Sequence, residues 1–190
     1  NYKDSKASGV WDINEALDLI KGGNWPNAAN INPAAFVDAL FQTHLYDGNG
    51  GTQTITNDIN LSGSGGLVWI KNRETAYAPM LYDTVRGLPS LLYSSATGAA
   101  DTTSGLATDT VTAFNSNGFS LGNEPAANTN GDSHVAWTFR KASKFFDIVT
   151  YTGNNTARTI SHNLGSVPGM IMIKRTDSSD IWYVYHRSIG

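Results

Sequence analysis

The chain contains no cysteine, which excludes disulfides, thiolate metal sites and cysteine nucleophiles. Charge is also scarce: only 15% of the 190 residues are Asp, Glu, Lys or Arg, against about a quarter in an average globular protein. The net charge of −3 provides no basic field for a phosphate backbone, so nucleic acid is not an expected partner. No apolar run approaches the roughly 20 residues of a membrane span, and the start lacks a secretion-signal pattern, so membrane insertion is not expected either.

What the chain does contain is a duplicated segment. The residues Phe41–Asn49 return as Phe146–Asn154, and Gly66–Lys71 return as Gly169–Lys174. The spacing between the copies is the length of a domain, not of a solenoid repeat, and residues 88–143 have no counterpart after the second copy. The sequence therefore predicts one complete module followed by the start of a related one. The predicted regions are 1–33 (N-terminal helix and linker, for attachment), 34–143 (β-sandwich module) and 144–190 (second, incomplete module).

The opening region has helical signals. Asp12–Glu15 has the pattern of a capping box, and Gly22–Gly23 is a stop, so a helix is predicted over 13–21. An extended linker is expected to follow as far as Pro33. Residues 33–40 are expected to form a short helical turn that runs into a strand.

From Phe41 onward the pattern is that of an all-β domain, in which short apolar runs alternate with clusters of Gly, Asn, Asp and Ser. Asn117–Gly118 predicts a tight hairpin, since both residues tolerate a positive φ. The polar stretches 95–106 and 123–132 are interpreted as surface loops, with no helix between the strands. This pattern predicts a β-sandwich of jelly-roll (lectin-like) type, with a short N-terminal helical segment. The expected strands are 41–46, 52–56, 66–71, 79–85, 90–94, 110–114, 118–121 and 134–141.

In the second copy, four strands are expected. They are 145–152, 157–161, 169–174 and 182–186. Four strands are half a sandwich, which would expose the inner face of its sheet and the edges of its strands. Either the chain continues beyond Gly190 or another subunit covers that face, and continuation is the favoured expectation.

No metal or cofactor site is predicted. The four histidines do not stand at ligand spacings such as i, i+2 or i, i+4; they are His44, His134, His162 and His186. His162 occupies the place of Asn57 in the first copy, which indicates a turn residue. Asp47–Gly51 resembles part of a calcium loop, but it lacks the distal Glu and Thr152 replaces Asp47 in the second copy, so a hairpin turn is the better interpretation.

No catalytic residue is predicted, and the chain is not expected to be an enzyme. A Gly-x-Ser-x-Gly elbow is absent, so Ser-His-Asp chemistry has little support. Glycoside hydrolysis needs two carboxylates across a cleft. The candidates Asp83, Asp109 and Asp132 stand at predicted strand ends or in loops, where isolated acids are usually turn caps.

Aromatic side chains could grip sugar rings or fill a core, and the sequence holds five tryptophans and eight tyrosines. Met172 replaces Trp69 in the second copy, an exchange that suits a core position better than a sugar platform. Trp137 alternates with apolar neighbours and is also expected in the core. No role is predicted for Trp182, Tyr183 and Tyr185, so the ligand-binding residues stay unknown.

Several long motifs resemble a module that recurs in tail-fibre and related receptor-binding proteins of tailed bacteriophages, especially marine ones. In the first copy these motifs are Gly66–Arg73, Met80–Gly87, Phe114–Gly122 and Asn130–Trp137. In the second copy they are Ile148–Gly153, Ile160–Leu164 and Trp182–Arg187. The opening segments Gly9–Asn14 and Gly23–Pro26 are similar to sequences found upstream of such modules.

The resemblance implies a virion structural protein, a tail-fibre segment that positions host-recognition modules for adsorption. It implies a location on the tail, outside the host, a homotrimeric state, and contact with other tail or baseplate proteins or a host surface glycan. It carries over no catalytic residue. The loops are shorter than those common in the family, which favours the shaft or proximal part over the receptor-contacting tip. Three further functions stay open: a carbohydrate-binding lectin-like module, a tailspike polysaccharide depolymerase, and a head fibre or decoration protein.

Overall fold

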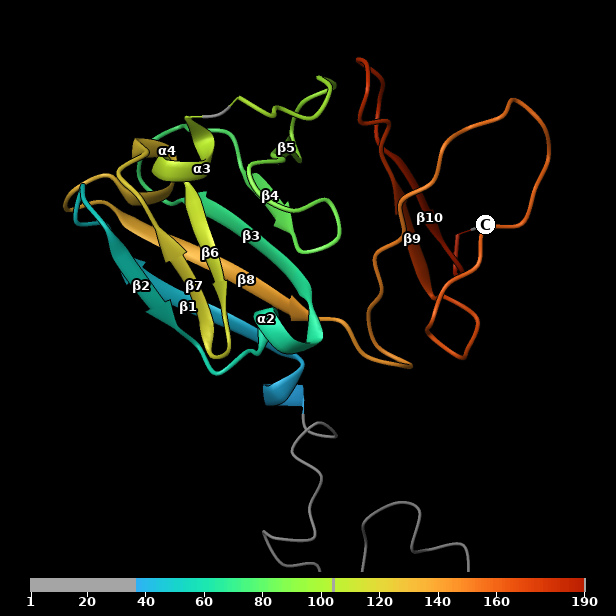
Figure 1. Ribbon diagram of the computed structural model, residues 1–190, viewed down its shortest axis with the longest axis horizontal. Helices are drawn as coiled ribbons and strands as arrows, with labels where there is room; N and C mark the ends of the chain where they lie inside the picture. Colours follow the sequence, from blue (N-terminus) through green and yellow to red (C-terminus); the bar gives the residue numbers. More distant parts are fainter. Residues whose placement is uncertain (1–36, 104, 190) are drawn as a thin grey trace, which may run out of the picture. The chain divides into compact units, whose positions relative to one another are not determined.

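The computed structural model describes residues 37–103 and 105–189, which belong to one compact unit, Phe36–Gly190 (Figure 1). The helix predicted over 13–21 and its linker lie outside the described residues. The first described element is the 3-10 helix η3 (Val37–Ala39), which leads into strand β1 (Phe41–Asp47). This order agrees with the helical turn and strand expected around residue 40.

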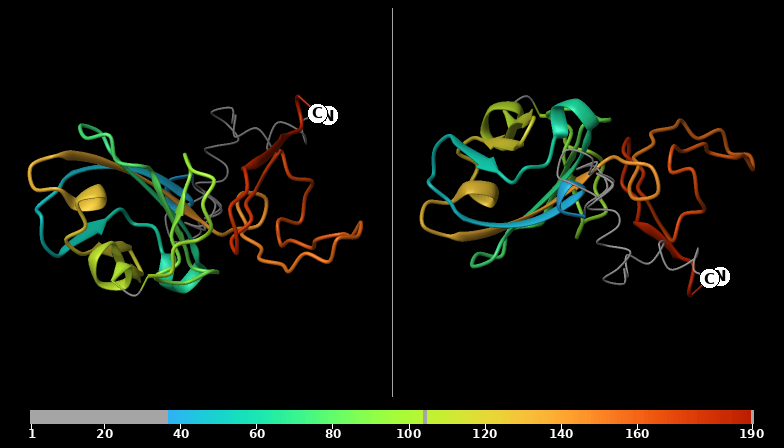
Figure 2. Two further views of the ribbon diagram at one scale, coloured as in Figure 1. Left: turned by 90° about the horizontal axis from the view of Figure 1, so that it is seen from above. Right: turned by 90° about the horizontal axis from the view of Figure 1, so that it is seen from below.

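The strands form three antiparallel sheets, as Figures 1 and 2 show. In the largest sheet the order is β1, β8 (Ser133–Arg140), β3 (Gly66–Asn72), β4 (Met80–Asp83) and β5 (Leu92–Tyr93). A three-stranded sheet has the order β2 (Gln53–Thr56), β7 (Gly118–Leu121) and β6 (Val111–Asn115). The third sheet pairs β9 (Met170–Ile173) with β10 (Tyr183–His186).

One hydrophobic core lies between the five-stranded and the three-stranded sheet. Val68 and Ile70 of β3 are fully buried in this core together with Phe119 of β7. Successive side chains of a strand point to opposite faces, so Leu67 and Trp69 lie on the other face of the larger sheet, where they are half-buried. Two antiparallel sheets around one core confirm the predicted all-β class and fit a sandwich. The jelly-roll type stays a prediction.

All eight strands expected in the first copy are present, but three one-turn helices were missed. These helices are α2 (Leu61–Ser64), α3 (Leu106–Asp109) and α4 (Pro125–Asn128). The side chains of Asn60 and Glu124 cap α2 and α4, and Pro125 stands at the start of α4. The interpretation of 123–132 as a surface loop is therefore wrong in part, because α4 buries Ala127 and Asn128 completely.

The predicted hairpin at Asn117–Gly118 is formed by β6 and β7, with Asn115 paired to Gly118. Only Gly118 adopts a positive φ, of 146°, whereas both residues were expected to. Glycine is required here for a second reason. A Cβ atom at Gly118 would lie 2.0 Å from the carbonyl oxygen of Ile55 on the neighbouring strand β2.

In the second copy, β9 and β10 confirm two of the four expected strands, whereas 145–152 and 157–161 form no strand. The reason is the absence of pairing partners. In the first copy, the corresponding strands β1 and β2 pair with β8 and β7. Among the described residues, the second copy has no strand that corresponds to β7 or β8.

Candidate interaction surface

The hairpin β9–β10 repeats the hairpin β3–β4 in the same register. Ile70 is paired with Met80 in the first copy, and Ile173 is paired with Tyr183 in the second. All four residue pairs of β9–β10 are related in this way to the four pairs of β3–β4, by a constant shift along the chain. The duplication seen in the sequence is therefore also a duplication of structure.

The hydrogen bonds that extend the two hairpins are also equivalent. Thr84 donates its backbone N–H to the carbonyl of Gly66, and Arg187 donates to the carbonyl of Gly169; both N···O distances are 3.0 Å. Each bond lies one residue beyond the paired strands, at the same end of the hairpin.

The two hairpins differ in burial. Tyr82 has no exposed surface, whereas its counterpart Tyr185 is 43% exposed. Ile70 is likewise fully buried, and its counterpart Ile173 is 42% exposed. The exposed residues of the second hairpin occupy both of its faces, and they are Met170, Ile171, Met172, Ile173, Tyr183, Val184 and Tyr185. The counterparts of the core residues Val68, Ile70, Met80 and Tyr82 thus belong to an open apolar surface in the second copy, which makes this surface a candidate for interaction.

One edge of β9 is also open. In the first copy β3 lies between β4 and β8, whereas within the described part of the chain β9 is paired with β10 alone. Natural edge strands are usually protected from pairing with another chain by Lys, Pro or a bulge. The sequence of β9 is Met-Ile-Met-Ile, which contains none of these. The surface therefore combines apolar side chains with unprotected backbone groups.

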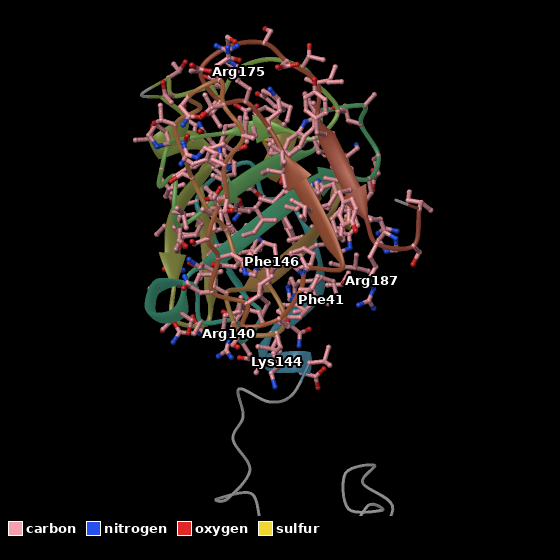
Figure 3. All side chains as sticks on the ribbon, turned by 90° about the vertical axis from the view of Figure 1, so that its right-hand side faces the viewer. Phe41, Arg140, Lys144, Phe146, Arg175 and Arg187 are labelled. Carbon is pink, nitrogen blue, oxygen red and sulfur yellow. The ribbon has the colours of Figure 1, made fainter. Side chains whose placement is uncertain are left out.

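Basic side chains flank this hairpin, with Arg175 after β9 and Arg187 after β10 (Figure 3). The Arg175 guanidinium pairs with Asp177 at 2.6 Å, which lowers the pKa of the Asp177 carboxyl. Both side chains are exposed, so the pair exchanges readily with other charges.

The loop of the second hairpin is bonded to backbone carbonyls of β5 and of the segment that follows it. Trp182 donates its indole Nε1–H to the carbonyl of Tyr93 at 3.2 Å, and Asp180 donates its N–H to the carbonyl of Thr97 at 2.8 Å. Lys174 Nζ reaches the same Thr97 carbonyl at 3.1 Å. Trp182, for which the sequence predicts no role, therefore anchors the second hairpin to the first copy.

A second set of contacts joins the copies where β8 ends. Phe139 packs against Phe41 and Phe146, with ring centroids 4.7 and 5.3 Å apart; Phe41 and Phe146 are labelled in Figure 3. Lys141 and Asp147 form an ion pair of 3.1 Å. Burial alone would raise the pKa of Asp147, but hydrogen bonds from the Asn163 N–H and from Lys141 lower it. At the junction, the charged Asp147 carboxylate therefore accepts hydrogen bonds from several donors.

Comparison with known proteins gives one match. Residues 38–190 match the model of a family described as a domain of unknown function, DUF7483. This chain belongs to the DUF7483 family. The match spans both copies of the duplicated segment, including the β9–β10 hairpin. Neither a curated protein nor a solved structure is similar to the chain.

Three of the histidines of this DUF7483 domain, His134, His162 and His186, make local hydrogen bonds. His162 Nδ1 accepts the N–H of Leu164, as the Asn57 side chain accepts the N–H of Ile59. This equivalence agrees with the turn role predicted for His162. His186 makes the same kind of bond to the N–H of Ser188, and His44 lies on β1.

His134 is fully buried, stacks on Tyr46 and has its Nδ1 atom 2.9 Å from the Asp132 carbonyl oxygen. Because a carbonyl accepts, Nδ1 carries the proton. Within the described ranges, no three His, Cys, Asp or Glu side chains are grouped to hold a metal ion, and no helix is long and apolar enough to cross a bilayer.

The three candidate carboxylates belong to separate elements: Asp83 ends β4, Asp109 ends α3 and Asp132 precedes β8. Asp83 accepts the N–H groups of Val85 and Arg86 and forms an ion pair with the Arg86 guanidinium. Asp109 accepts the Thr108 hydroxyl. Asp132 accepts Asn72 Nδ2–H and the Thr75 hydroxyl, and these bonds lower the pKa of its carboxyl.

The turn Asp47–Gly51 is not a hairpin, contrary to expectation, because it joins β1 of the five-stranded sheet to β2 of the three-stranded sheet. The buried Asn128 holds this corner: its amide accepts the Asn49 N–H and donates to the carbonyl of Gly51. No sequence pattern near the turn indicated so distant a partner.

The two tryptophans predicted in the core lie outside it. Trp69 and Trp137 meet edge to face with ring centroids 5.6 Å apart, on the face of the large sheet opposite the core. Trp69 Nε1 is buried, with no hydrogen-bond partner among the described residues. No signal in the sequence indicated this, because residues 67–70 are all apolar, and only the structure shows that Val68 and Ile70 occupy the inner positions.

Proposed function

We propose that this DUF7483 chain is a non-enzymatic structural segment of a phage virion, a section of tail fibre that positions host-recognition modules for adsorption. The observation that supports this proposal best is the repeated hairpin. A chain that builds the same hairpin twice, in one register, is organised as modules in series. Such an arrangement suits an extended fibre, and the motifs that resemble tail-fibre modules occur in both copies.

The junction between the copies also supports a structural role. Phe139 and Phe146 are in contact, and Asp147 is bonded to Lys141 and to the N–H of Asn163. Lys144 donates its N–H to the Leu164 carbonyl at 2.7 Å. Aromatic packing combined with a partly buried ion pair makes a joint stiffer than a Gly/Ser linker. A fibre that presents receptor-binding modules needs joints of this kind.

The proposed partners are further copies of the chain in a homotrimer and other tail or baseplate proteins. Association would bury the apolar side chains of β9 and β10, which are 41–55% exposed in the single chain. The proposed location is the virion tail, outside the host.

Gold-labelled antibodies against the chain, applied to purified particles and viewed by electron microscopy, test the proposal. Label is expected along the tail, with quantitative mass spectrometry giving a copy number that is a multiple of three. Label on the capsid would instead assign a head fibre or decoration protein. Purified particles that contain none of the chain would overturn the structural proposal altogether.

The activity of the purified chain separates a structural role from a depolymerase and from a lectin-like module. The chain is expected to release no oligosaccharide from host polysaccharide and to bind no immobilised host glycan. Release of oligosaccharides would establish a depolymerase and overturn the proposal. Saturable glycan binding would assign a lectin-like module, and binding that failed after removal of the exposed apolar side chains of β9–β10 would locate it there.

A further inference from the structure

We infer that the β9–β10 hairpin is a separate order–disorder unit, which stays folded only while its loop is docked on the first copy. Residues 174–182, the docking loop, join the two strands and are bonded to β5 and to the segment after it. When these contacts open, β9 and β10 lose their structure, while the two sheets around the core keep theirs. The inference concerns this chain alone and does not depend on the proposed location in a virion.

The two strands of the hairpin contribute little to their own stability. They pair over four residues each, from Ile173 opposite Tyr183 to Met170 opposite His186. A two-stranded hairpin is marginally stable at best in water unless another element packs against it. All eight paired residues are exposed. The hairpin therefore needs support from another part of the chain.

Burial in this region is confined to the docking loop. Among residues 170–189, the residues that are not exposed are four half-buried ones of this loop: Lys174, Ser178, Asp180 and Trp182. Three of the four, Lys174, Asp180 and Trp182, are bonded to the carbonyls of Tyr93 and Thr97. The support for the hairpin therefore comes through its loop and not through its strands.

The docking loop and the first copy exchange backbone hydrogen bonds in both directions. Asp180 donates its N–H to the Thr97 carbonyl, and Ala100 donates its N–H to the Thr176 carbonyl at 2.9 Å. Trp182 adds a side-chain donor, which reaches the carbonyl of Tyr93 at the end of β5. A single hydrogen bond of this kind contributes little net stability, so the docked state depends on the whole set.

The other half of this contact belongs to the folded sandwich. Leu91 is fully buried in the core, and it exchanges two backbone hydrogen bonds of 2.8 Å with Asp101. This pair closes the loop that contains Thr97 and Ala100. The first copy therefore keeps its half of the contact when the docking loop leaves.

The segment that leads into the hairpin is attached independently. Lys144 donates its N–H to the Leu164 carbonyl, and Asp147, which is paired with Lys141, accepts the N–H of Asn163. These contacts fix residues 141–164 without the docking loop. Opening of the hairpin therefore begins after them and leaves the junction intact.

Opening of the hairpin also exposes little additional apolar surface. The apolar side chains of β9 and β10 are already 41–55% exposed, whereas Ile70 and Tyr82 of the equivalent hairpin have no exposed surface. The hydrophobic cost of opening is proportional to the apolar area that is newly exposed. The second hairpin therefore opens at a lower free energy than the core of the sandwich.

The docking loop thus controls whether the exposed apolar surface exists. In the docked state, Ile171, Ile173, Tyr183 and Tyr185 lie on one face of the hairpin, because successive side chains alternate between faces. In the open state the strands are unpaired and this face is lost. The device is an order–disorder transition of one segment on a folded scaffold.

Native-state amide exchange of the full chain, at increasing low concentrations of denaturant, tests the inference. Because Arg187 is bonded to Gly169, the bonded pairs of the hairpin are Ile171 with Tyr185 and Ile173 with Tyr183. Their equivalents in the first copy are Val68 with Tyr82 and Ile70 with Met80.

The amides of the second hairpin are expected to share one opening step and to exchange at least about a hundredfold faster than their equivalents. Their exchange should also depend less on denaturant, because less surface is exposed in the opening. Equal protection of the two hairpins would show that the second opens only with the sandwich. Absence of protection in the second would show that it is not folded. Either result overturns the inference.

Trp182→Ala removes the indole donor and the half-buried ring from the docking loop. The amides of β9 and β10 are then expected to exchange at least about tenfold faster, with Val68 and Ile70 unchanged. Ile181→Ala is the matched control, since Ile181 is the adjacent large side chain and is 53% exposed; it should alter neither hairpin. The inference is overturned if Trp182→Ala changes nothing, if both variants act equally, or if Trp182→Ala unfolds the sandwich together with the hairpin.

Discussion

At the scale of single residues, Asn128 organises the corner between β1 and β2. It is fully buried and donates to the carbonyls of Gly51 and Gly122, while it accepts the N–H of Asn49. Asn128→Ala removes the partner of the buried Gly122 carbonyl, at a cost of about 1–3 kcal/mol, and of the partly buried Asn49 N–H and Gly51 carbonyl, at a smaller cost. We expect the free energy of unfolding, measured with a chemical denaturant, to fall by about 3 kcal/mol. Asn123→Ala, at an exposed neighbour, is the control and should change it by less than about 0.5 kcal/mol.

Two buried tyrosines make the fold sensitive to alkali. Tyr46 donates to the Ala127 carbonyl and Tyr82 to the Thr110 hydroxyl, each at 2.7 Å, and desolvation by burial raises the pKa of both phenols well above their ordinary value. The folded chain then retains protons that the unfolded chain releases above about pH 10. The contribution of the two protonated phenols to the free energy of unfolding is therefore fully present below about pH 10. Above that pH the free energy of unfolding falls by up to about 1.4 kcal/mol per pH unit for each tyrosine.

The measurement is the free energy of unfolding from about pH 8 to about pH 11.5, together with tyrosinate absorbance. Tyr46→Phe and Tyr82→Phe combined should flatten the alkaline decline, because phenylalanine does not titrate. An equally steep decline in the double variant would show that other groups cause it.

At the scale of elements, the hairpin β6–β7 depends on Gly118. Alanine at this position would place its Cβ 2.0 Å from the Ile55 carbonyl oxygen, and the backbone φ of 146° disfavours any side chain. We expect Gly118→Ala to lower the free energy of unfolding by more than about 2 kcal/mol, with a lower thermal midpoint as the readout. Gly98→Ala, which meets no atom within 4 Å, should be close to neutral.

The elements that local pattern determines could be predicted, and those that depend on distant partners could not. The eight strands of the first copy follow from short apolar runs bounded by turn residues, and β9 follows from the likeness of Gly169–Lys174 to Gly66–Lys71. Strands at 145–152 and 157–161 were expected for the same reason but lack neighbours, and a strand exists only as part of a ladder.

The exposed apolar surface of the β9–β10 hairpin could be predicted only in outline. The sequence predicts that half a sandwich would leave the inner face of its sheet uncovered by its own strands, and Tyr185 and Ile173 are exposed in the structure. The opposite faces of Trp69 and Val68 could not be assigned, because a strand with apolar residues on both faces has no visible alternation. No sequence pattern indicated the structural role of Asn128, since its partners on the β1–β2 turn lie far away along the chain.

At the scale of the whole molecule, the duplication provides an internal control for burial. Ile70 and Ile173 occupy equivalent positions with equivalent chemistry, but one is fully buried and the other is 42% exposed. Ile70→Ala should therefore cost about 2–5 kcal/mol of unfolding free energy, whereas Ile173→Ala should cost less than about 1 kcal/mol. If denaturant titrations gave the same loss of unfolding free energy for both variants, the second hairpin would be covered in the isolated chain.

The open edge of β9 also has a consequence for how the chain reaches its fold. β9 has the same register on β10 as β3 has on β4, so its other edge can compete with β3 for β8. Residues 141–169, which separate β8 from β9, are about half as many as residues 73–132, which separate β3 from β8. Closing the shorter loop is favoured by about 0.6 kcal/mol, so the wrong pairing has an entropic advantage early in folding. Synthesis from the N-terminus removes the competition, because β3 is present before β8 emerges and β9 is not. Refolding from denaturant lacks this order, and we expect it to yield a slowly converting population with β8 on β9, distinguishable by amide exchange from the newly synthesised chain.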